Sequence, residues 1–125
     1  PPTHPLVEAV RFPVERLRQE PFIEFLPGQE TDNSRMLQQL QIRPKVRFAP
    51  SDSRAAIAMV RAGLGITLLN DILTADLADG VAVLPLDPPQ SVHLGIALPE
   101  EEHVSPAAKR FITYALDRLP ELDVL

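Results

Sequence analysis

The sequence predicts an α/β fold with an at least partly parallel sheet. Three observations support this prediction: candidate strands alternate with candidate helices through the middle of the chain, one stretch has the pattern of a βαβ unit, and prolines separate the periodic segments. Of the 125 residues, 45% are hydrophobic and 23% are charged. This composition is typical of a globular domain, or part of one, that buries a core of its own.

The βαβ unit runs from Arg47 to Asn70. In its first strand, Val46 and Phe48 alternate with more polar neighbours, and Pro50 ends the strand because proline cannot donate to a ladder. The helix that follows carries apolar residues at helical spacing, Ile57, Val60 and Leu64. Gly63 is expected to end it. The apolar run Ile66–Leu69 predicts a parallel strand covered on both faces. We expect the crossover to be right-handed.

Residues 1–20 read as a connecting arm with one turn of helix near Glu15–Gln19. A strand is expected at Pro21–Leu26, followed by a Pro27-Gly28 turn. Thr31, Asp32 or Asn33 can cap the next helix, whose apolar positions are Met36, Leu37, Leu40 and Ile42, and which ends at Pro44.

After the βαβ unit, a short helix capped by Asn70 or Asp71 is expected, then strands at Val81–Leu84 and Val92–Leu98. Ser105 and Pro106 form a good start for a last helix. That helix places its apolar residues on one stripe: Ala108, Phe111, Ile112, Ala115, Leu116 and Leu119.

The carboxyl ends of parallel strands are where ligands settle in open α/β sheets. In the βαβ unit this edge is Ala49–Ser53, where free N–H groups of the helix start favour an anion. The alternative is that Ser51, Asp52 and Ser53 only cap the helix. Asp52 itself opposes a bare anion, because its carboxylate competes for the same donors.

Charge and motifs exclude several function classes. The formal net charge of −5 argues against direct binding of nucleic acid. The chain has no cysteine, no glycine-rich phosphate loop, no serine elbow, and three histidines far apart in sequence, so we expect no enzyme, no metal site and no cofactor. There is no membrane-length apolar run and no signal-peptide pattern, and the first residue is not Met. We therefore expect a piece of a longer cytoplasmic protein.

Several phrases resemble the effector-binding domain of LysR-type transcriptional regulators. They are H-P-L at His4–Leu6, L-x-x-E-P-F-I at Leu17–Ile23, S-D-S-R-A-A-I-A-M-V-R-A-G-L-G-I-T-L-L at Ser51–Leu69, G-V-A-V-L-P-L at Gly80–Leu86 and S-P-A-A-K-R-F at Ser105–Phe111. The resemblance covers nearly the whole chain, and the Ser51–Leu69 phrase is the most specific.

The resemblance implies a three-layer, mostly parallel α/β subdomain like those of type 2 periplasmic binding proteins. Residues 21–90 would be the second subdomain, and residues 91–125 a strand and helix that return to the first. A small, anionic or polar effector would lie in the cleft between subdomains, against Pro50, Ser51, Asp52 and Ser53, with Gly28 and Thr31 as a weaker second loop. The parent protein would bind DNA through a separate N-terminal domain, and we expect residues 1–125 to associate as a homodimer, as the family does through its effector domains. The alternative is half of a transporter's solute-binding protein, which shares the fold.

Overall fold

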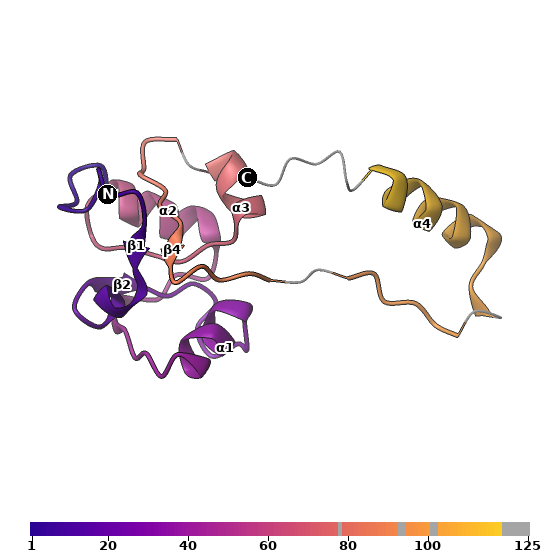
Figure 1. Cartoon of the computed structure of the whole chain (residues 1–125), viewed down its shortest axis with the longest axis horizontal. Helices are drawn as coiled ribbons and strands as arrows, with labels where there is room; N and C mark the ends of the chain where they lie inside the picture. The colour runs from indigo at the N-terminus through magenta and orange to yellow at the C-terminus, as the bar shows by residue number, and fades with distance from the viewer. Residues whose placement is uncertain (78, 93–94, 101–102, 119–125) are drawn as a thin grey trace. The chain divides into compact units, whose positions relative to one another are not determined.

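The computed structural model describes residues 1–77, 79–92, 95–100 and 103–118 (Figure 1). The chain divides into two compact units, Pro1–Val92 and His93–Leu125. Unit one contains, in chain order, β1 (Phe12–Pro13), the 3₁₀ helix η1 (Val14–Arg18), β2 (Pro21–Ile23), α1 (Asp32–Gln39), β3 (Lys45–Phe48), α2 (Ser53–Arg61), α3 (Asp71–Leu77) and β4 (Leu86–Asp87). Unit two contains α4 (Pro106–Arg118).

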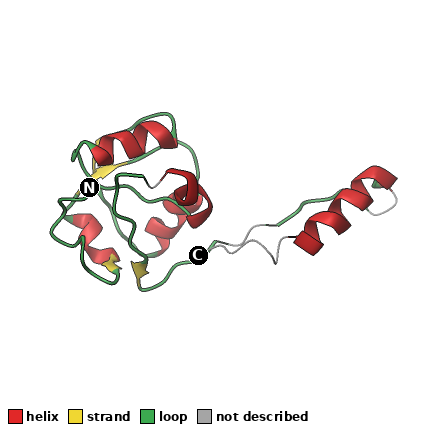
Figure 2. Cartoon of the chain, turned by 90° about the horizontal axis from the view of Figure 1, so that it is seen from above, coloured by secondary structure: helices red, strands yellow, loops and turns green. Residues whose placement is uncertain are grey.

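All strand pairings in the described residues are parallel, as the alternation of strands and helices predicts. β2 pairs with β3, and a register shift separates Phe22↔Val46 from Ile23↔Phe48. On its other side, Phe22 of β2 forms a parallel bridge with Ile66. The helix of the predicted βαβ unit therefore connects two segments that flank β2. A second parallel pair joins β1 to β4, with Phe12 opposite Leu86. Most connections between helices are loops rather than long strands (Figure 2).

Two helices cover opposite faces of β2, because successive residues of a strand point to opposite sides. Phe22 belongs to a buried cluster that includes Leu37 of α1, whereas Ile23 belongs to a second cluster with Ala56 and Val60 of α2. Figure 1 shows α1 and α2 on either side of the strands. Around β2, unit one thus has the layered arrangement of an α/β domain.

The ends of α2 follow from local chemistry. Asp52 is the N-cap, and its side chain accepts a hydrogen bond from the N–H of Ala55. At the other end, the N–H of Gly63 donates to the carbonyl of Val60, and the N–H of Leu64 donates to that of Met59. Gly63 has a φ of +78°, a value that glycine adopts without the strain other residues incur. These bonds form a Schellman motif, so the predicted stop at Gly63 is confirmed.

The first twenty residues, expected to form a connecting arm, contribute to the core of unit one. Phe12, Val14 and Leu17 are buried and belong to the same cluster as Phe22 and Leu37. Leu17 lies in η1, close to the helical turn predicted at Glu15–Gln19. The spacing of these apolar residues is too irregular to mark them as core from the sequence alone.

Three strand predictions in unit one need correction. The run Ile66–Leu69 is not a strand, because only Ile66 pairs, in an isolated parallel bridge with Phe22. The residues Val81–Leu84 are not a strand, and the strand of this region is β4 at Leu86–Asp87. The strand forms at Leu86–Asp87 because this segment pairs with β1. The N–H of Phe12 also donates to the carbonyl of Pro85 at 2.8 Å, next to the β1–β4 pair. The strand predicted at Pro21–Leu26 ends at Ile23, and Leu26 has a φ of +55°, outside the extended region.

Unit two contains the predicted final helix, but the described part of the strand predicted at Val92–Leu98 is not a strand. Ser105 accepts a hydrogen bond from the N–H of Ala108 at 3.2 Å, as an N-cap does. No residue of α4 is buried, and the side chain of Phe111 is 66% exposed. Of the strand expected at Val92–Leu98, the described residues 92 and 95–98 are not in a strand. An extended segment needs a neighbouring strand to pair with, and no strand pairing includes a described residue of unit two. His93, Leu94 and Leu119 lie outside the described residues.

Candidate functional site

Hydrogen bonds hold three segments together at the carboxyl edge of β2 and β3. Beyond the ladder, the N–H of Glu24 donates to the carbonyl of Phe48 at 3.0 Å, and the N–H of Leu26 donates to that of Pro50 at 3.2 Å. The loops that lead from β2 to α1 and from β3 to α2 therefore run side by side. They contain five of the six residues predicted to contact an effector, and the sixth, Ser53, is the first residue of α2.

The third segment is the one that follows Ile66. The hydroxyl of Thr67 donates to the carbonyl of Ile23 at 2.8 Å, where β2 ends. The side-chain amide of Asn33, in the first turn of α1, donates to the carbonyl of Leu68 at 2.8 Å. These bonds bring the start of α1 and the residues after Ile66 to the same edge, which we define as the carboxyl edge: residues 24–33, 49–54 and 67–70.

The loop before α2 presents groups that a polar ligand could use. The carboxylate of Asp52 is occupied by the N–H of Ala55 at 2.8 Å. Within the described residues, no hydrogen bond involves the hydroxyls of Ser51 and Ser53 or the N–H groups of Ser53 and Arg54. Ser51 is exposed and Ser53 is half-buried. Pro50 is also half-buried and uses its carbonyl to accept from Leu26. The loop thus offers hydroxyls and helix-start donors in addition to a working cap.

In the loop before α1, unlike the loop before α2, the hydroxyl groups are used in hydrogen bonds that start the helix. Thr31 and Ser34 form a capping box: the Thr31 hydroxyl accepts from the N–H of Ser34 at 3.1 Å, and the Ser34 hydroxyl accepts from the N–H of Thr31 at 2.8 Å. Of the three caps that the sequence allowed, Thr31 is the one used. Gly28 is exposed with a φ of +76°, and a Cβ at this position would meet no atom within 4 Å. The backbone conformation explains this glycine without a ligand.

Sequence reasoning did not select Asn33 and Thr67 as residues of this edge. Thr67 is a polar residue within the apolar run Ile66–Leu69, which is the available signal. For Asn33 the sequence indicates only a possible helix cap. Both join the edge through contacts with residues about 35 to 44 positions away in the sequence, which no local pattern indicates.

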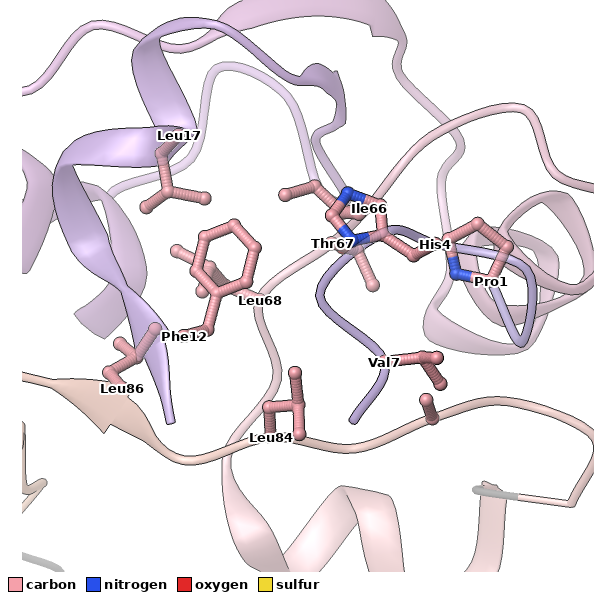
Figure 3. Close-up of a pocket in the computed structure, with 11 residues that line it drawn as sticks. Pro1, His4, Val7, Phe12, Leu17, Ile66, Thr67, Leu68, Leu84 and Leu86 are labelled. Atoms are coloured by element: carbon pink, nitrogen blue, oxygen red, sulfur yellow. The ribbon is translucent and has the colours of Figure 1, made fainter. Parts of the chain in front are cut away.

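A cavity of about 90 Å³ lies elsewhere in unit one (Figure 3). Its wall includes Thr67 but none of the six predicted residues. The cavity does not include the loop before α2, but it shares Thr67 and Leu68 with the carboxyl edge.

No group of three or more His, Asp or Glu side chains that could hold a metal ion occurs in the described part of the chain. Within the same residues, no helix is long and apolar enough to cross a membrane. The three histidines differ: His4 is largely buried, His103 is exposed, and His93 lies outside the described residues.

Comparison with protein families gives a match to the LysR substrate binding domain over residues 1–120. A search of curated proteins gives no match. The matched family is one of regulatory, ligand-binding domains with the fold of periplasmic binding proteins. The parallel pairing around β2 and the two covering helices are compatible with that fold. Because the match extends over almost the whole chain, this protein belongs to the LysR substrate-binding domain family.

Proposed function

We propose that the chain is the effector-sensing part of a LysR-type bacterial transcriptional regulator, and that its effector is a small polar or anionic molecule bound at the carboxyl edge. The family match over residues 1–120 is the observation that carries this proposal. The loop from Pro50 to Ser53 is the best candidate contact, and Gly28 and Thr31 form a secondary one.

The hydrogen-bond inventory supports a ligand with acceptor oxygens. Two serine hydroxyls and two N–H groups at the start of α2 lack a partner within the described residues. A carboxylate or hydroxyl of the effector can accept from them, and the start of a helix favours negative charge. Asp52 weakens that preference, although its carboxylate already accepts from Ala55. A ligand that combines acceptors with a donor toward Asp52 fits these groups better than a bare anion.

The resemblance implies that a first subdomain supplies the opposite wall of the cleft. The effector would then bind more tightly to the intact regulator than to residues 1–125. For this reason the intact regulator is the appropriate protein for a ligand screen.

The screen uses thermal shift with a panel of organic acids, amino acids and sugars. A compound that raises the melting temperature is then titrated against Ser51→Ala and Ser53→Ala. Loss of one hydrogen bond to a charged group costs about 1.5–3 kcal/mol of affinity, which is about a tenfold to hundredfold change. Ser105→Ala, which removes the N-cap of α4, is the matched control.

We expect at least one of the two loop variants to weaken binding while retaining the melting temperature of the unliganded protein. The control should lower the melting temperature slightly and leave the affinity unchanged. Unchanged affinity in both loop variants would reduce the loop to a helix cap and contradict the proposed site.

A further inference from the structure

Glu24 is a half-buried carboxylate that has no partner within the described residues. Among the Asp, Glu, Lys and Arg residues whose burial the structure describes, only Glu20 and Glu24 are not exposed. Glu20 accepts a hydrogen bond from Arg16 at 3.0 Å, whereas no hydrogen bond or ion pair in the described residues involves the Glu24 side chain. Partial burial of an unpaired carboxylate costs free energy. The fold therefore does not account for this side chain.

The position of Glu24 places it at the carboxyl edge. It directly follows β2, and its N–H donates to the carbonyl of Phe48 at 3.0 Å, where β3 ends. Among the described residues that are not exposed, the one buried side-chain nitrogen or oxygen without a partner is Nε2 of His4. The oxygens of Glu24 also lack a partner, so they must be accessible from the surface. A ligand at the carboxyl edge can reach them.

The neighbouring start of α2 has the opposite polarity. The N–H groups of Ser53 and Arg54 are without a hydrogen bond in the described residues, and the exposed Arg54 side chain makes no ion pair there. A cation in the first turn of a helix opposes the helix dipole, so a negative group bound here would be favoured by the dipole and would offset the charge of Arg54. The hydrogen bond from the N–H of Leu26 to the carbonyl of Pro50 keeps the two loops side by side.

We propose that the effector is a zwitterion of the amino-acid class, and that Glu24 is the residue that selects for its amino group. The inference rests on the effector site proposed above and names the class of molecule that this site takes. The carboxylate of the ligand would accept from the start of α2, and its ammonium group would donate to Glu24. An organic acid without the amine would leave Glu24 unpaired beside a second negative charge, which discriminates against it.

Matched compounds test this class on the intact regulator. Each standard amino acid is compared by thermal shift with its deaminated acid and its decarboxylated amine. We expect at least one amino acid to raise the melting temperature, and both of its truncated forms to raise it less. A panel in which no amino acid raises the melting temperature, or a deaminated acid that binds as tightly as its amino acid, would overturn the inference.

Glu24→Gln then tests the residue by calorimetric titration. It should weaken binding of the amino acid about tenfold to hundredfold, because a hydrogen bond to a charged group is lost, and should leave binding of the deaminated acid unchanged. The melting temperature of the unliganded protein should not fall, since this carboxylate has no partner to lose. A purely structural role for Glu24 would lower that melting temperature and weaken both ligands equally, and would overturn the assignment.

Glu30→Gln is the matched control on the same loop. Glu30 is exposed, and its carboxylate already accepts from Arg35 at 3.1 Å. This variant should retain the preference for the amino acid over the deaminated acid. A preference that Glu24→Gln also retains would contradict the role of Glu24. If binding is nevertheless weakened by Ser51→Ala or Ser53→Ala, the effector site itself stands and only the assignment of Glu24 fails.

Discussion

Asp52 illustrates how a single side chain connects the fold to the candidate site. Its carboxylate accepts from the N–H of Ala55 at 2.8 Å and so begins α2. The neighbouring hydroxyls of Ser51 and Ser53 make no hydrogen bond within the described residues. The cap is therefore carried by Asp52, whereas the free hydroxyls proposed to contact the effector belong to Ser51 and Ser53. Their effects on stability and on binding should separate.

Asp52→Ala should lower the free energy of unfolding by about 1 kcal/mol, the usual cost of losing an N-cap. Urea unfolding of the chain, followed by circular dichroism, measures this loss. Ser51→Ala is the matched control, since the exposed Ser51 side chain contributes no cap bond. A larger loss for Ser51→Ala than for Asp52→Ala would contradict the assignment of the cap.

Gly65 is constrained by packing rather than by its backbone angles. A Cβ at this position would lie 2.4 Å from the carbonyl oxygen of Pro21. That oxygen also accepts the N–H of Ile66 at 2.9 Å, a bond that holds the segment Ile66–Leu69 against β2. Gly65→Ala forces the backbones apart, and overpacking of this kind costs about 1–3 kcal/mol.

The measurement is again the free energy of unfolding in urea. Gly95→Ala serves as the control, because a Cβ there meets no atom within 4 Å. Equal stability of Gly65→Ala and the unmodified chain would show that the contact between Gly65 and Pro21 is not a constraint on the fold.

At the level of single residues, the sequence predicted what depends on neighbours in the chain. The Asp52 cap is one of the candidates that the sequence named, and the Gly63 stop is confirmed, because each requires only the adjacent helix turn. The roles of Asn33, Thr67 and Glu24 depend on contacts with distant segments or on burial. No local pattern contains that information.

Helices are easier to predict from the sequence than strands, because helix hydrogen bonds join residues that are close in the chain. The predicted helices at α1, α2, α3 and α4 are all present, because a helix satisfies its backbone within itself. A strand requires a partner, so an apolar run alone did not predict one at Ile66–Leu69, Val81–Leu84 or Val92–Leu98; the Ile66–Leu69 run forms only a single bridge, at Ile66. The run Val81–Leu84 lies beside β4 but outside the β1–β4 pair, and the described part of the run Val92–Leu98 is not in a strand.

Helices α2 and α4 should differ in local stability. α2 buries Ala56, Ile57 and Val60, whereas α4 buries no residue. Burial of an apolar face supplies most of the stability of a helix in a protein. Amide hydrogen exchange of the chain should therefore be at least about tenfold faster in the middle of α4 than in the middle of α2. Similar protection in the two helices would show that α4 is covered in solution.

At the scale of the whole molecule, α4 presents an apolar surface that a second copy could cover. Phe111 is 66% exposed and Leu116 is 57% exposed, and both belong to the stripe predicted from the sequence. Exposed apolar patches of this kind are sites of association. We predict that residues 1–125 form a homodimer through this stripe, and the LysR family resemblance points in the same direction.

Sedimentation velocity at micromolar concentration measures this association. Phe111→Ser should shift the equilibrium toward monomer, because it removes a large apolar side chain from the stripe. Arg110→Ser, at an exposed position of the same helix outside the stripe, should leave the equilibrium unchanged. A monomer for the unmodified chain, with α4 intact by circular dichroism, would contradict the prediction.

Amide exchange of the intact regulator, with and without the effector found by thermal shift, tests most directly whether the carboxyl edge is the effector site. The N–H groups of Ser53 and Arg54 make no hydrogen bond within the described residues, so they should exchange rapidly in the free protein. We predict that the effector slows their exchange and leaves Gly63 and Leu64, at the opposite end of α2, unchanged. Slower exchange at Gly63 and Leu64 without any change at Ser53 and Arg54 would contradict an effector site at this edge.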